Sequence, residues 1–118
     1  MTVQSCYAAM GGDYADVFGR LRTDERIQKF LSLFLKDTSF SDLTVAVKGG
    51  HAEDAFRAAH TLKGICGNLS LTKLLNVIVE LTEMLRGKTE VGQDVAMLLP
   101  TAQSAYEETV QAIHRLID

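Results

Sequence analysis

The sequence has little of what breaks helices or builds sheets. It contains a single proline, Pro100, and almost no stretch in which apolar and polar residues alternate, as they do in a half-buried strand. Apolar residues instead recur at spacings of three and four over nearly the whole chain. The sequence therefore argues against a sheet-based fold and predicts an all-helical protein.

A long uncharged hydrophobic run is also missing. The most apolar region, residues 69–85, is interrupted by Lys73, Asn76, Glu80 and Glu83, which excludes a membrane-spanning helix there. The first 18 residues have neither a basic leader nor an unbroken apolar core, so they do not resemble a signal peptide. We expect a soluble, cytoplasmic protein without a membrane partner.

The sequence shows no pattern typical of a binding site for a nucleic acid, a metal or a nucleotide. The formal net charge is −3, and the basic residues form no stripe that could follow a nucleic-acid backbone. The two cysteines lie far apart, and we expect Cys66 to be a reduced, buried thiol. No two of the three histidines have the i, i+4 spacing of a metal site, and no glycine-rich loop ends in Gly-Lys-Ser or Gly-Lys-Thr. We expect no cofactor in this chain.

A chain of 118 residues, 47% of them hydrophobic, suits one domain, which we take as residues 1–118 and as a monomer. Residues 1–12 are expected to be a loosely attached segment, followed by a short helix over residues 13–21 that caps a bundle. Thr23 is the expected N-cap of the next helix, and Ser41 that of a short helix over residues 42–48.

Three further helices are expected, covering residues 51–69, residues 71–85 and a last stretch that ends near residue 116. Ser70 is the expected N-cap of the second, and Pro100 either opens or kinks the third. A tight hairpin makes the first two antiparallel neighbours. The expected fold is all-α, an up-and-down antiparallel four-helix bundle with a short additional N-terminal helix. Its core is expected to include Phe30, Phe34 and Phe56.

The most unusual stretch is AAHTLKGICGNL, residues 58–69, which has helical apolar spacing and yet contains Gly64 and Gly67. Each glycine inside a helix costs about 1 kcal/mol relative to alanine. A helical projection places His60 away from the apolar arc, with the two glycines one and two turns beyond it. The glycines therefore bare the surface beside an exposed imidazole, although Gly67 alone is also a candidate C-cap.

An exposed neutral imidazole is a nucleophile that can accept a phosphoryl group. On the projection, Lys63 stands between His60 and the edge of the core, where its flexible stem can bring the ammonium toward the added negative charge. Gly64 would let a partner's active site approach the histidine. We interpret His51 and His114 as structural.

The stretch HTLKG at residues 60–64, followed by Gly67 and Leu69, resembles the signature of histidine-containing phosphotransfer (HPt) domains. The order and size of the expected helices are similar to those of the family over nearly all of residues 13–117. The resemblance implies that His60 accepts a phosphoryl group from a receiver-domain aspartate of a response regulator and passes it to another receiver aspartate. It also implies that Mg²⁺ belongs to the receiver.

The implied partners are receiver domains and a hybrid sensor histidine kinase. The expected docking surface is the His60 face, with Arg57 and Lys63 supplying positive charge toward an acidic receiver site and Gly64 and Gly67 permitting approach. Nothing in the chain resembles a nucleotide-binding domain, so we expect a phosphoryl carrier without kinase activity of its own.

The chain departs from the family pattern at two positions. Many relatives have glycine at the turn between the two helices of the hairpin, where this chain has Ser70, which suggests a serine-capped turn. Many have glutamine or glutamate on the next helix to orient the imidazole, where this chain has Thr82. A threonine hydroxyl is shorter, so Thr82, Glu80 and Glu83 all stay candidates for that orienting role.

Two other interpretations stay open. In the first, the chain is a helical interaction module that is not phosphorylated and binds a receiver or kinase as a decoy or inhibitor, with Thr82 as the feature that favours it. In the second, the residues are a piece of a larger hybrid histidine kinase. The initial methionine and the end of the chain soon after the last helix favour a complete small protein.

Overall fold

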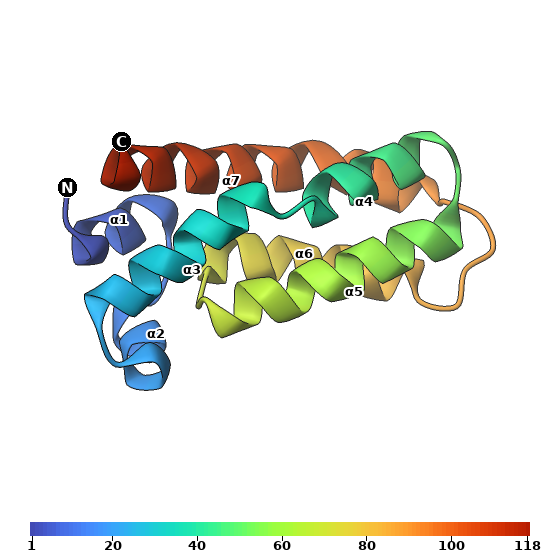
Figure 1. Cartoon of the computed structure of the whole chain (residues 1–118). Coiled ribbons are helices and arrows are strands. Elements are labelled where there is room, and N and C mark those ends of the chain that lie inside the picture. Colours follow the sequence, from blue (N-terminus) through green and yellow to red (C-terminus); the bar gives the residue numbers. More distant parts are fainter.

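The computed structural model describes residues 1–118 and contains seven helices and no strand (Figure 1). The helices are α1 (Val3–Met10), α2 (Tyr14–Leu21), α3 (Asp24–Lys36), α4 (Ser39–Lys48), α5 (Ala52–Asn68), α6 (Thr72–Leu85) and α7 (Gln93–Ile117). The prediction of an all-helical protein is therefore confirmed. No helix combines the length and the apolar character needed to span a bilayer.

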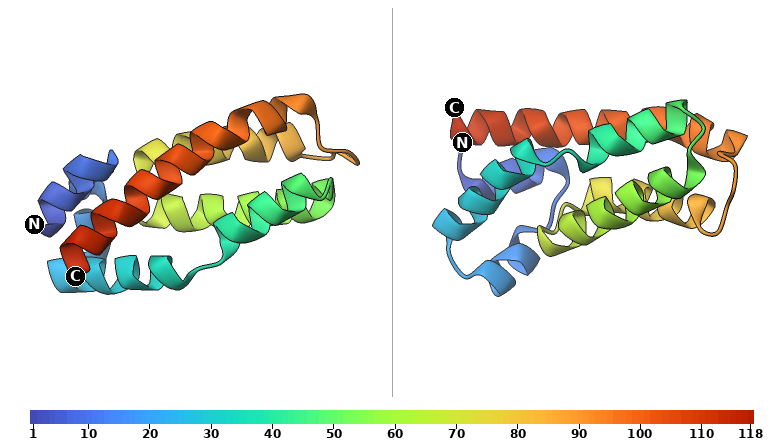
Figure 2. Two further views of the ribbon diagram at one scale, coloured as in Figure 1. Left: turned by 90° about the horizontal axis from the view of Figure 1, so that it is seen from above. Right: turned by 45° about the vertical axis from the view of Figure 1, so that its right-hand side comes forward.

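The helices pack around a single cluster of buried apolar side chains. α4 packs on α5, α5 on α6 and α6 on α7, while α7 also contacts α1, α3 and α4. Figures 1 and 2 show an elongated molecule with α1, α2 and the C-terminus at one end and the α4–α5 and α6–α7 connections at the other. Pro100 lies inside α7, near the middle of its first half, rather than at its start.

A short break at Asp37 and Thr38 separates α3 from α4. The Asp37 carboxylate accepts a hydrogen bond from the Ser39 amide at 2.9 Å, and the Thr38 hydroxyl bonds to Asp42 at 3.1 Å. α4 consequently begins at Ser39, earlier than the predicted residue 42. The prediction that Ser41 caps this helix was wrong, because polar groups further upstream serve its first turn.

The expectation that residues 1–12 form a loosely attached segment was also wrong. Thr2 and Ser5 form a reciprocal capping box at the start of α1, which packs on α7. One face of α1 is fully buried, through Val3, Cys6, Tyr7 and Met10. The Tyr7 hydroxyl donates to the Leu69 carbonyl at 2.8 Å, so the segment is tied to the end of α5.

The α5–α6 turn is centred on Ser70, whose φ of 54° lies in the left-handed region. Ser70 does not cap α6, which begins after Leu71 without a side-chain cap, so that prediction was wrong. Its hydroxyl instead donates to Asp16 at 2.7 Å and accepts a hydrogen bond from Arg20. The Asp13 amide donates to the Ser70 carbonyl at 2.9 Å. The turn is thus held by α2 and its N-cap.

Candidate functional site

His60 lies on the exposed side of α5, as the helical projection predicted. The opposite side is buried in the core through Ala55, Ala59, Leu62 and Cys66. Glu53 and Asp54 stand in the first turn of α5, where negative charge is favourable to a helix N-terminus. Burial of four small or apolar side chains on one face thereby fixes the rotation of α5 and turns His60 toward solvent.

A shallow groove surrounds His60, and we call it the His60 groove. It is lined by His60, Lys63, Gly64, Gly67 and Asn68 from α5 and by Leu75 and Val79 from α6. A Cβ atom added at Gly64 or at Gly67 would meet no heavy atom within 4 Å. Close packing inside the chain therefore does not require either glycine. Both glycines lie within α5, which ends at Asn68, so Gly67 is not the C-cap.

Lys63 is half-buried, lies in the His60 groove and forms no ion pair in the structure. The charge of Lys63 also acts on Glu83 of α6. The pKa of Glu83 is lowered mainly by the hydrogen bond and the charge of Arg86, and Lys63 adds a smaller contribution. An unpaired ammonium beside an exposed imidazole provides positive charge where a phosphoryl group added to His60 would bring negative charge.

The imidazole of His60 packs against an aromatic ring rather than a polar side chain. The Phe56 ring lies 5.8 Å from the His60 ring, centroid to centroid, at an interplanar angle of 35°. The Arg86 guanidinium lies over the Phe56 ring at 5.1 Å and bonds to Glu83 at 2.8 Å. Phe56 is half-buried, not a core residue as expected. Its i, i+4 spacing from His60 is the sequence signal that could have placed it here.

Thr82 is completely buried, and its hydroxyl donates to the Ile78 carbonyl at 2.7 Å. It therefore neither bonds to His60 nor is accessible to a docking partner. Thr82 accordingly fits neither of its expected roles, which were to orient the imidazole and to contact the partner. Glu83 is engaged by Arg86, and Glu80 is exposed without a hydrogen bond to His60. No side chain of α6 orients the imidazole through a hydrogen bond.

Arg57 contributes less free charge to this surface than expected. It is exposed, one turn before His60, and pairs with Glu53 at 3.0 Å and with Asp54. These two carboxylates offset its positive charge locally. Of the two cations of α5, only Lys63 lines the His60 groove, and it forms no ion pair.

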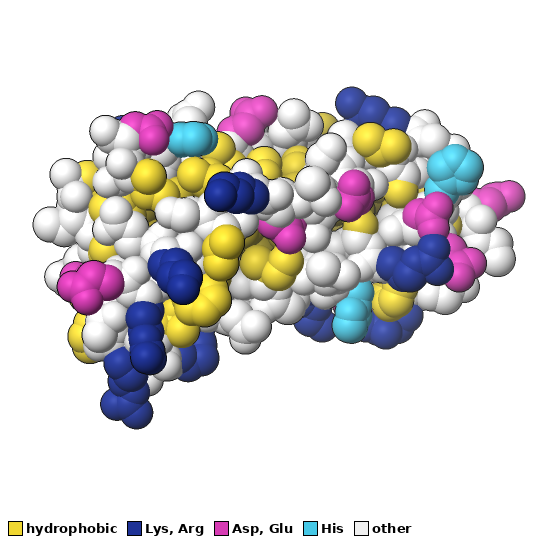
Figure 3. Space-filling view, viewed as in Figure 1, with side chains coloured by type: hydrophobic (Ala, Val, Ile, Leu, Met, Phe, Trp, Pro, Cys, Tyr) yellow, Lys and Arg dark blue, Asp and Glu magenta, His cyan; other side chains and the backbone are white.

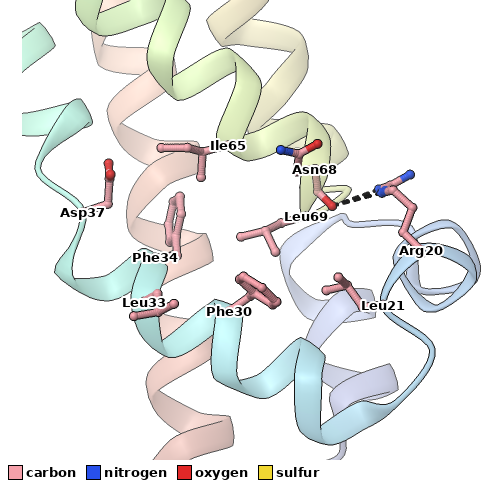
Figure 4. Close-up of a pocket in the computed structure, with 9 residues that line it drawn as sticks. All are labelled: Arg20, Leu21, Phe30, Leu33, Phe34, Asp37, Ile65, Asn68 and Leu69. Carbon is pink, nitrogen blue, oxygen red and sulfur yellow. Dashed lines mark hydrogen bonds between the residues drawn. The ribbon is translucent and has the colours of Figure 1, made fainter.

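The C-terminal end of α5 is held by Arg20 of α2, which the sequence analysis did not identify. Arg20 donates to the carbonyl oxygen of Asn68 at 3.0 Å (Figure 4) and to that of Gly67 at 3.2 Å. These carbonyls belong to the last helical turn, where acceptors lack partners within the helix and a cation is favourable. Hydrogen bonds from Ser70, and then from Arg20, lower the pKa of the Asp16 carboxyl.

The remaining reactive side chains do not form a second centre with His60. Cys66 faces the core, and its burial raises the pKa of the thiol to about 12, which keeps it protonated. His114 pairs with Asp118 at 3.1 Å near the end of α7. No group of three or more His, Cys, Asp and Glu side chains converges as a metal site would require.

A known protein family matches the part of the chain that contains the His60 groove. The family model described as the Hpt domain matches residues 25–116, which begins in α3, ends in α7 and includes the whole His60 groove. No curated protein and no solved structure matches the chain significantly. A match that covers most of the chain and includes the exposed histidine, the lysine and the two glycines of the His60 groove shows that the chain belongs to the Hpt domain family.

Proposed function

We propose that this protein is the phosphoryl carrier of a two-component phosphorelay, with His60 as the residue that is phosphorylated. The observation that carries the proposal is the His60 groove, in which an exposed imidazole stands beside the unpaired Lys63 and two glycines at which an added Cβ would meet no heavy atom within 4 Å. Membership of the Hpt family supports a role in histidine phosphotransfer in general.

In the proposed reaction the donor is the aspartyl phosphate of a receiver domain. The lone pair of an unprotonated ring nitrogen of His60 attacks phosphorus and forms a P–N bond. The P–O bond to the aspartate breaks, and its electron pair leaves with the carboxylate. Lys63 offsets the charge that the phosphoryl group brings, and the reverse of these steps passes the group to a second receiver. Mg²⁺, held by the receiver, supplies charge neutralisation at the phosphoryl oxygens.

We propose the following arrangement for the domain. α3 and α4 act as one broken helix that, with α5, α6 and α7, makes an up-and-down antiparallel four-helix bundle, supported by the order in which these helices contact one another. The working form is a cytoplasmic monomer, and its partners are receiver domains and a hybrid sensor kinase that contains one.

A decoy that binds a receiver without carrying phosphate is not favoured. The feature that motivated it was Thr82, taken as a replacement for an orienting residue beside His60. Because Thr82 is buried and bonded within α6, its identity has no direct bearing on the imidazole.

The test is transfer of radiolabelled phosphate from a receiver domain charged by a small-molecule phosphodonor. We expect acid-labile, base-stable label on the wild-type protein and none on His60→Gln. His51→Gln and His114→Gln are matched controls that should retain the label, since neither residue lines the His60 groove. Absence of label on folded wild-type protein that still binds receivers would contradict the carrier function and revive the decoy.

A further inference from the structure

Along α5, the imidazole of His60 has a side chain on one side and none on the other. Four residues after it stands Gly64, whereas four residues before it stands Phe56, whose ring centroid lies 5.8 Å from that of the imidazole. Side chains of a helix lean toward its N-terminus, so a helical residue covers the one four positions earlier. Gly64 opens access to His60 and leaves the imidazole without support on that side, while Phe56 supports it from the other.

No polar group of α5 or α6 takes over this support. The other neighbour on the preceding turn, Arg57, is engaged by Glu53 at 3.0 Å and by Asp54 in the first turn of α5. No side chain of α6 bonds to the imidazole, as described above. The outer torsion of a histidine side chain is broad and roughly two-fold, so an exposed imidazole without a hydrogen bond has no fixed ring orientation of its own. Packing against the Phe56 ring limits that freedom.

Phe56 is itself held in place from the end of α6. Its side chain is half-buried, and the guanidinium of Arg86, the C-cap residue of α6, lies over its ring at 5.1 Å. Arg86 in turn bonds to Glu83 at 2.8 Å. A cation over an aromatic face is attracted by the ring, whereas an exposed ion pair contributes little by itself. The Phe56 ring therefore bridges α5 and α6 and has less freedom than an isolated surface phenylalanine.

Phe56 supports the imidazole from outside the path of approach. The His60 groove is lined by residues from His60 onward on α5 and by two residues of α6, and Phe56 is not among them. A partner that enters along Gly64 and Gly67 reaches the imidazole without displacing the Phe56 ring. The contact between the two rings can therefore persist in the complex in which phosphate is transferred.

We propose that Phe56 is the positioning residue of His60, whose ring holds the imidazole so that the reacting nitrogen faces the His60 groove. The inference rests on the proposed function and deepens it. Phe56 does not touch the phosphoryl group and acts only through His60. Orientation of the attacking atom changes the rate of the step after the complex has formed. Loss of the Phe56 ring should therefore lower kcat and leave KM nearly unchanged.

The test measures transfer from a phosphorylated receiver domain at varied receiver concentration. Phe56→Leu keeps an apolar side chain and removes the ring, whereas Phe56→Tyr keeps the ring. We expect kcat to fall by about tenfold in Phe56→Leu with KM nearly unchanged, and to recover most of its value in Phe56→Tyr.

Phe18→Leu is the matched control. Phe18 is 39% exposed, its ring packs against Tyr14 in the same helix at 5.6 Å, and it does not line the His60 groove. Both kcat and KM should equal the wild-type values in this variant. Urea denaturation of all three variants shows that they are folded.

A spectroscopic measurement on the protein without a receiver tests the ring contact itself. An aromatic ring shifts the proton resonances of groups that pack on it, so the ring-proton resonances of His60 should move in Phe56→Leu and stay near their wild-type values in Phe56→Tyr. His51 and His114 are internal controls that should not move. Figure 3 shows histidine side chains, in cyan, at well-separated places on this face of the molecule.

Four outcomes would overturn the inference while the carrier function stands. A rise in KM at unchanged kcat in Phe56→Leu would make Phe56 a docking contact, and a loss of stability with unchanged kcat would leave it a structural role alone. Phe56→Tyr as slow as Phe56→Leu would show that the ring does not matter. Unmoved His60 resonances in Phe56→Leu would show that the rings do not pack. Failure of the wild type to accept phosphate from any receiver removes the proposed function, and this inference with it.

Discussion

The hydroxyl of Ser70 donates a hydrogen bond to the carboxylate of Asp16 at 2.7 Å, which joins the turn after the His60 helix to α2. Arg20 bonds to the same hydroxyl and to the last carbonyls of α5. The φ of 54° at Ser70 costs a residue with a Cβ about 1–2 kcal/mol relative to a right-handed conformation. The bonds to α2 offset that strain and fix where α5 ends.

Replacement of Ser70 should separate strain from hydrogen bonding. Ser70→Ala keeps the left-handed backbone and loses both side-chain bonds, so we expect the free energy of unfolding to fall by about 1–2 kcal/mol. Ser70→Gly loses the same bonds but relieves the strain, so its loss should be smaller by about 1 kcal/mol. Urea denaturation measures both. Ser41→Ala, at an exposed position of α4, is the control and should change little. Equal losses for Ala and Gly would contradict the strain at this turn.

The free energy of unfolding should depend on pH through the Asp16 carboxyl. The hydrogen bond from Ser70, and then the Arg20 guanidinium, lower the pKa of this carboxyl in the folded state. Its contribution is therefore present above the unfolded-state pKa of about 3.9 and is lost as the pH falls through the lower folded-state value. Asp16→Asn should be less stable than wild type at neutral pH, and the difference should shrink below about pH 4.

Denaturation at several pH values, with a double variant, checks this assignment. Because Asp16 and Ser70 share one hydrogen bond, the losses in Asp16→Asn and Ser70→Ala should be less than additive in the double variant. Parallel pH profiles for wild type and Asp16→Asn would show that the carboxylate does not contribute in this way.

Local patterns predicted the features whose physical cause is local. Apolar spacing alone gave the all-helical fold and the exposure of His60, because the burial of one helix face determines the opposite one. Thr82 was also within reach of this reasoning. It is four residues after Ile78 and three before Leu85, both buried, so the projection places it on the core face of α6.

Features that depend on residues distant in the sequence were missed. A serine hydroxyl before a helix can cap it or bond elsewhere, and the partner of Ser70, Asp16, is 54 residues away. α1 has eight residues, too few for a stable isolated helix, and is held by its contacts with α7. Phe30 was expected in the core and is 42% exposed, because a helical projection shows which face is apolar but not whether another helix covers it.

Thr82→Val should test whether position 82 affects the chemistry at His60. Valine has nearly the same shape and only removes the bond to the Ile78 carbonyl, so the free energy of unfolding should change by less than about 1 kcal/mol. The rate of transfer to His60 should be unchanged, since the side chain is completely buried. Single-turnover labelling measures it. Slower transfer with unchanged stability would show that Thr82 contributes to the chemistry at His60.

Lys63 should act through its charge. Lys63→Ala removes the unpaired ammonium from the His60 groove, so we expect transfer to slow by about tenfold, equivalent to about 1.4 kcal/mol of lost stabilisation. Lys63→Arg retains the positive charge and should recover part of the rate. The control is Arg57→Ala, which should have a smaller effect because Glu53 and Asp54 already offset its charge. If Lys63→Ala and Arg57→Ala slow transfer equally, Lys63 has no special relation to the phosphoryl group.

Gly64 should show opposite effects on stability and on transfer. A Cβ there meets nothing within 4 Å, and glycine is the poorer helix former, so Gly64→Ala should raise the free energy of unfolding by about 0.5–1 kcal/mol. Gly64→Leu should also fold, yet its side chain would fill the groove beside His60 and slow transfer by about tenfold or more. Gly19→Leu is the matched control, because Gly19 lies in α2 and a Cβ there is equally unobstructed. It should leave transfer unchanged. If Gly64→Leu transferred phosphate at the wild-type rate, access would not be the reason for glycine at position 64, and the only remaining effect of that glycine would be its cost to the helix.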